Sequence, residues 1–126
     1  MADARFTKLA DLLVNYSTEV QPGENVLVEA IGIDAALVKE IVKTVHKAGG
    51  RPYVTIRDQK ITRELLMDAT EEQMNTWADY DNYMMDQMQA YIAVRGGENL
   101  YELSDVPADK MKNYQTLYSQ IGRAHV

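Results

Sequence analysis

The chain has 126 residues, a length that suits one domain with a buried core. Its formal net charge of −6 argues against a nucleic-acid partner, because phosphates are bound by clustered Lys and Arg. The lack of cysteine excludes disulfides and thiolate metal sites, and no apolar run approaches the roughly 18 residues of a membrane span. No secretory signal is visible at the start of the sequence, so we expect a cytoplasmic protein without a membrane partner.

The first half of the chain predicts a helix, a strand and a second helix. Apolar residues at three- and four-residue steps over 6–16 indicate an amphipathic helix, and the turn signal at 21–24 ends it. Residues 25–30 (NVLVEA) are apolar and β-branched, as in a buried strand. Asp34 is placed to cap a helix that ends at Gly49, since glycine tolerates the left-handed conformation found there.

The second half predicts two further strands that alternate with helices. Residues 51–57 (RPYVTIR) favour a strand, and 62–89 favour two helices, the second with a capping box at 70–73. A third strand is expected at 91–95, and a last helix at 107–118. This alternation implies parallel strands joined by crossovers. The predicted fold class is therefore α/β, an open, mainly parallel sheet of three or more strands with helices on both faces.

The carboxyl ends of these strands are where a ligand would bind in an open α/β sheet. No glycine-rich phosphate motif follows the first strand. Arg57, Asp58 and Arg95 follow the second and third strands, and arginines in a shared crevice would bind a carboxylate. Two other roles fit these three residues: pairing with one another at the surface, and contact with a neighbouring domain.

Metal ligands and nucleophiles are scarce. A catalytic zinc site needs three ligands from His, Glu or Asp, and the chain has only two histidines, His46 and His125, with no H-E-x-x-H motif. No serine stands in a G-x-S-x-G context. We therefore predict no catalytic residue and no metal ligand in this chain.

A methionine and aromatic stripe lies within the long helical region. Trp77, Tyr80, Met84 and Met88 recur at helical spacing. Methionine thioethers can hold Cu(I), but this pattern is more typical of a core or an interface, where methionine packs adaptably beside rings. We expect either core packing or a face that docks another domain or subunit.

Three ordered segments carry a family resemblance: 21–30 (QPGENVLVEA), 47–54 (KAGGRPYV) and 90–99 (AYIAVRGGEN). Together they resemble the amino-terminal domain of the thermophilic metalloprotease family, which includes aminopeptidases T and S. The resemblance covers 1–120. It implies a cytoplasmic, homodimeric exopeptidase that removes amino-terminal residues from peptide substrates with two divalent metal ions (Zn, Co or Mn). It also implies that the metal ligands lie in a carboxy-terminal catalytic domain missing here, so this fragment of a two-domain protein would be inactive and bind no metal.

The last six residues, 121–126 (IGRAHV), have a different origin in our interpretation. They are what ATC GGA AGA GCA CAC GTC encodes, a string found in a common sequencing adapter. We expect a native domain at 1–120 and an artefact at 121–126; the alternative is the native end of the last helix. Two rival functions stay open, a free-standing α/β module that binds a small ligand and an oligomerisation domain. A severed sheet should also make the isolated fragment aggregate or form soluble oligomers.

Overall fold

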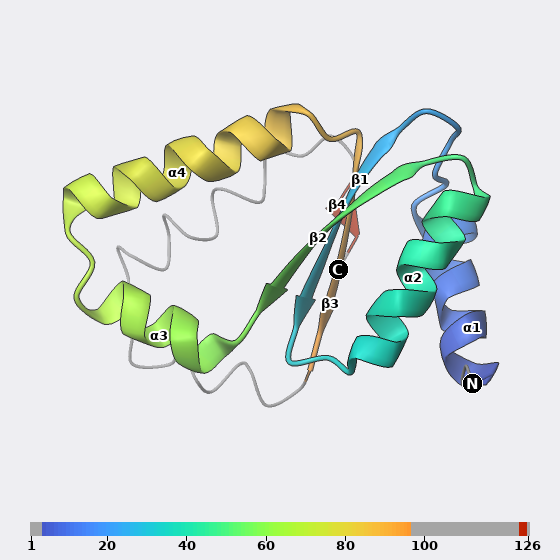
Figure 1. Cartoon of the computed structure of the whole chain (residues 1–126), viewed down its shortest axis with the longest axis horizontal. Coiled ribbons are helices and arrows are strands. Elements are labelled where there is room, and N and C mark those ends of the chain that lie inside the picture. The colour runs from blue at the N-terminus through green and yellow to red at the C-terminus, as the bar shows by residue number, and fades with distance from the viewer. Residues whose placement is uncertain (1–3, 97–123, 126) are drawn as a thin grey trace.

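A computed structural model describes residues 4–96 and 124–125, which form a parallel sheet with helices on both faces (Figure 1). The α/β prediction is therefore confirmed. In chain order the elements are α1 (Ala4–Asp11), the π-helical turn η1 (Leu12–Ser17), β1 (Asn25–Ile31), α2 (Ala35–Lys47), β2 (Arg51–Arg57), α3 (Gln59–Met67), α4 (Glu71–Asp86), β3 (Ala90–Arg95) and β4 (Ala124–His125). No helix within these described ranges is long and apolar enough to cross a membrane.

The strand order is β2-β1-β3-β4, and every neighbouring pair is parallel. The chain leaves β1 for β2 through α2, then returns past β1 through α3 and α4 to reach β3. The register places Ile31 between Arg57 and Arg95, so both arginines lie at the carboxyl edge of the sheet. Residues paired across parallel strands point to the same face, so the two arginines also share a face.

The larger core lies between the sheet and the first two helical elements. Val26, Val28 and Ile92 point to this face, because alternate residues of a strand project to one side. They pack against Ile41 and Val45 of α2, with α1 and η1 alongside.

The opposite face of the sheet is covered by α4 and the segment that follows it. Leu27 and Tyr91 pack there against Met85 and Met88. Glu29 follows Leu27 by two residues on β1, so it points to the same face, and it is fully buried. A buried carboxylate needs a partner, and that partner defines the site described below.

Local signals explain most helix boundaries. Asp34 accepts a hydrogen bond from the Ala36 amide at 2.9 Å, and Thr70 accepts one from the Gln73 amide at 3.0 Å, so both predicted caps are confirmed. The first of the two predicted helices begins earlier than position 62, at Gln59. The last predicted helix, 107–118, lies outside the described residues.

The turn that precedes β2 packs tightly against the turn that precedes β1. Gly49 has a φ of +85°, and its carbonyl accepts a hydrogen bond from the Gly23 amide at 2.9 Å. A Cβ atom at Gly50 would lie 2.9 Å from a methyl group of Val20. A larger residue at Gly50 would therefore require this contact to open.

Candidate functional site

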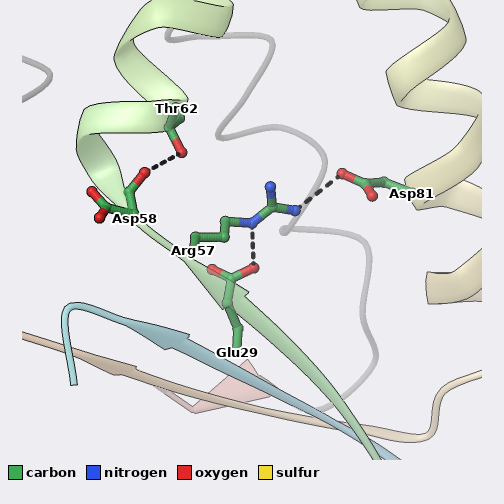
Figure 2. Close-up of polar contacts among 5 residues, drawn as sticks. All are labelled: Glu29, Arg57, Asp58, Thr62 and Asp81. Carbon is green, nitrogen blue, oxygen red and sulfur yellow. Dashed lines mark hydrogen bonds and ion pairs between the residues drawn. The ribbon is translucent and has the colours of Figure 1, made fainter. Parts of the chain in front are cut away.

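Arg57, the last residue of β2, is the centre of a buried polar cluster (Figure 2). Its Nε donates to Oε2 of Glu29 on β1 at 3.2 Å, and its Nη2 donates to Oδ2 of Asp81 on α4 at 3.5 Å. Its guanidinium carbon lies 5.6 Å from the centre of the Trp77 ring, a cation–π distance. We call these four residues, Glu29, Arg57, Trp77 and Asp81, the Arg57 cluster. It joins two strands to α4.

The electrostatics of the Arg57 cluster depend on burial. The Arg57 side chain is 14% exposed, Asp81 is buried, and Oε1 of Glu29 has no hydrogen-bond partner among the described residues. Two carboxylates face one guanidinium, so the ionised cluster carries a surplus negative charge. Burial raises the pKa of Asp81; Arg57 and a Trp77 hydrogen bond oppose that rise, and Glu29 adds to it.

The geometry of the Arg57 cluster suits a clamp better than a catalyst. The guanidinium is engaged by two carboxylates, which leaves neither acid placed as a general base toward an open site. A cavity of about 120 Å³ adjoins Arg57 and Asp81, between Tyr53 of β2 and Met84 of α4. That volume holds a few waters but not a peptide. The cluster therefore holds α4 against the carboxyl end of the sheet.

The two-metal centre that the family resemblance implies does not fit these residues. Within 4–96 and 124–125, no three His, Cys, Asp or Glu side chains converge on one point. Glu29 and Asp81 are bridged by the Arg57 guanidinium, whose positive charge would repel a metal ion there. His46 is exposed on α2. We derive no catalytic step through a metal from the described part of the chain.

The three residues predicted to share a crevice have separate environments. Arg57 is engaged as described, and Arg95 is exposed at the end of β3, on the far side of Ile31. Asp58 caps α3, accepting the Lys60 amide on its side chain at 2.9 Å. The Asp58 carbonyl accepts the Thr62 hydroxyl at 3.3 Å (Figure 2). The proximity of Arg57 and Arg95 follows from register, and a role in a crevice or domain contact stays a prediction.

The predicted docking stripe is divided between surface and core. Tyr80 is 71% exposed, whereas Trp77 and Met84 are partly buried. Met88 follows the end of α4 and is 7% exposed, in the core beside Leu27 and Tyr91. Docking by this stripe stays a prediction, and Tyr80 is the member that a partner would reach most easily.

Comparison with known proteins identifies the family. The sequence profile of the thermophilic metalloprotease (M29) family matches residues 2–125. The chain belongs to that family. No curated protein matches this M29 chain. Among solved structures, wild-type AmpT from Thermus thermophilus is similar, with a TM-score of 0.63 and 20% sequence identity. The match covers 93% of this M29 chain and 30% of the AmpT chain, and at this identity it concerns the fold alone.

Two members of the Arg57 cluster escaped the sequence reasoning, which singled out neither Glu29 nor Asp81. The signal for Glu29 was a lone charged residue inside the apolar strand of this M29 chain. Asp81 follows Trp77 by four residues, so the two side chains share one side of α4. A buried charge in an apolar strand is a usable signal, because such a group requires an opposite charge nearby.

Proposed function

We propose that this M29 chain is the amino-terminal domain of a metal-dependent aminopeptidase, a hydrolase that removes amino-terminal residues from peptides. The observation that carries the proposal is the family match over residues 2–125. The chain spans 30% of AmpT, which supports a longer parent protein with a further domain. We place the parent in the cytoplasm as a homodimer.

In this proposal a carboxy-terminal catalytic domain would hold two divalent metal ions (Zn, Co or Mn), which would supply Lewis-acid chemistry to a water molecule and to the scissile carbonyl. The described residues offer no ligand set for them. We therefore propose that the 126-residue chain alone is inactive. This chain would contribute an α/β domain in which the Arg57 cluster holds α4 against the sheet and the Tyr80 side chain is exposed.

The first test measures hydrolysis of a peptide with a free amino terminus by the purified chain, with Co²⁺, Zn²⁺ or Mn²⁺ added. We expect no turnover above a buffer control. An amino-terminally acetylated peptide and a chelator serve as controls for contaminating peptidases. Metal-dependent hydrolysis by the 126-residue chain would refute the proposed division of labour.

The second test resequences the source locus across the Gln120 codon with distant primers. We expect the frame to continue past Gln120 into a region rich in Glu and His, so that 121–126 is replaced by native sequence. The extended protein should then hydrolyse free-amino peptides in a metal-dependent manner and sediment as a dimer. A genuine stop codon directly after Val126 would overturn the enzyme proposal.

The rival function of a free-standing small-ligand module would use Arg57 and Arg95. Engagement of Arg57 by Glu29 and Asp81 weakens this alternative, because a ligand carboxylate would have to displace them. It predicts a melting temperature that rises with a small anion and no longer does so after Arg95→Ala. The oligomerisation alternative rests on exposed Tyr80 and predicts that Tyr80→Ala abolishes self-association.

A further inference from the structure

A hollow runs along the amino-terminal two-thirds of α4 and has a volume of about 590 Å³. Four of its lining positions, 70, 73, 77 and 80, recur at three- and four-residue steps and so form one stripe of the helix. Trp77 and Tyr80 supply two aromatic walls, and Glu72 supplies a carboxylate. The described residues that line it are Thr70, Glu72, Gln73, Thr76, Trp77 and Tyr80.

All charged residues of α4 are acidic. Its sequence, EEQMNTWADYDNYMMD, has five carboxylates and no Lys, Arg or His. Asp81 is engaged by Arg57, and the other four acids are exposed. The amino-terminal helix dipole amounts to about half a positive charge, which Glu71 and Glu72 together outweigh. Among the described residues, the carboxylates of α4 therefore favour a cationic ligand over an anionic one at the hollow.

Trp77 already makes a cation–π contact within the chain. The guanidinium carbon of Arg57 lies 5.6 Å from the ring centre, and Trp77 also lines the hollow, so this ring belongs both to the Arg57 cluster and to the hollow. Aromatic rings suit both an aliphatic side chain and a neighbouring cation. Glu72 beside these rings adds a direct charge partner for an ammonium or guanidinium group.

We propose that this hollow binds an internal segment of an extended peptide in which an aliphatic residue adjoins Lys or Arg. The aliphatic side chain lies between the Trp77 and Tyr80 rings, and the cationic group pairs with Glu72. The binding step needs no metal and no catalytic domain. It is independent of the proposed peptidase activity, so one can fail while the other stands.

The test uses the fluorescence of Trp77, which is the sole tryptophan of the chain. The 126-residue chain is titrated with acetyl-Gly-Leu-Lys-Gly-amide, and with peptides in which Glu replaces Lys or Gly replaces Leu. We expect a saturable change in emission with the first peptide and at least about tenfold weaker binding of the other two, a difference of roughly 1.4 kcal/mol. Added salt should weaken the first interaction.

Variants then locate the site. Glu72→Gln and Tyr80→Ala should each weaken binding about tenfold, whereas Glu64→Gln, an exposed carboxylate on α3 outside the hollow, should leave it unchanged. Calorimetric titration provides a second readout, and thermal melts check that each variant is folded. The proposal is overturned by equal affinity for the Lys and Glu peptides, by no binding in either assay, or by binding that requires a free amino terminus.

Discussion

Arg57→Met would leave the carboxylates of Glu29 and Asp81 buried without their shared guanidinium. Glu29 is fully buried, and the Arg57 side chain that neutralises it is itself 14% exposed. Methionine keeps much of the side-chain volume, so the substitution removes charge and hydrogen bonds more than packing. We expect a large loss of stability.

The magnitude follows from two opposing contributions. At an effective dielectric constant of about 20, unit charges at the observed separations of 3.2 and 3.5 Å attract by about 5 kcal/mol each. Burial deprives each ion of several kcal/mol of hydration, so the intact cluster contributes little net stability. Without Arg57 the hydration loss at the carboxylates is not offset, and the free energy of unfolding should fall by about 3–5 kcal/mol.

Urea denaturation followed by circular dichroism measures this loss. Arg63→Met is the matched control, because half-buried Arg63 forms an ion pair with exposed Glu64 on α3, and such a solvent-screened pair contributes about 1 kcal/mol or less. A domain has a stability of only about 5–15 kcal/mol, so Arg57→Met alone could unfold this one. A triple variant, Glu29→Met, Arg57→Met and Asp81→Leu, is therefore measured as well. Replacing the whole cluster with apolar residues should recover most of the loss.

The pH dependence of the stability loss in Arg57→Met tests its electrostatic cause. Without Arg57 the pKa of Asp81, which burial already raises, should rise further, because Arg57 opposes that rise in the intact cluster. The deficit of Arg57→Met should therefore be largest near neutral pH and shrink as acid protonates the carboxyl group. A loss below about 1 kcal/mol, or one that does not vary with pH, would show that the cluster is not an electrostatic clamp.

Three further predictions concern stability and association. In the intact chain the pKa of Asp81 is raised above its ordinary value of 3.8, so the folded state keeps this proton to higher pH than the unfolded state. The free energy of unfolding should therefore fall as the pH rises from 3.8 through the raised pKa. Asp81→Asn should remove this contribution, as measured by urea titrations across that pH range. Gly50→Ala should lower the free energy of unfolding by about 1–3 kcal/mol, because its Cβ would meet Val20 at 2.9 Å, and an unchanged urea midpoint would contradict this close packing. Ile56 is 71% exposed on edge strand β2, so Ile56→Lys should reduce self-association in sedimentation velocity with little change in melting temperature; undiminished association would place the contact elsewhere.

Sequence reasoning succeeded where the signal was local. The strand at 51–57 has the bounds predicted for it, because Gly50 precedes it and β-branched residues fill it. The sequence places the start of this helix at 62, three residues too late, because Asp58 fits a strand-end crevice as well as a helix cap; in the structure Asp58 caps α3. The side-chain hydrogen bond that identifies this cap is visible only in the structure. In the sequence, residues 59–61 show no apolar periodicity that would mark the first turn of the helix.

The contacts of Arg57 were beyond sequence reasoning because they are not local. Glu29 and Asp81 lie 28 residues before and 24 residues after Arg57, and no periodic pattern links such positions. Met88 shows a related limit. The predicted stripe requires a helix that continues to position 89. In the structure α4 ends at Asp86, and Met88 lies in the core. Helix ends decide which side chains share a face.

The central position of β1 has a consequence for synthesis on the ribosome. Its partners emerge later and at different times: β2 begins at Arg51, but β3 begins at Ala90. The Asn25 side chain, at the start of β1, donates to the Gln87 carbonyl across 62 residues of chain. Pairing over such separations is slow, because loop closure must precede it. Until β3 has left the exit tunnel, the nascent chain therefore presents one edge of β1 with unpaired backbone groups, where a holdase chaperone would act.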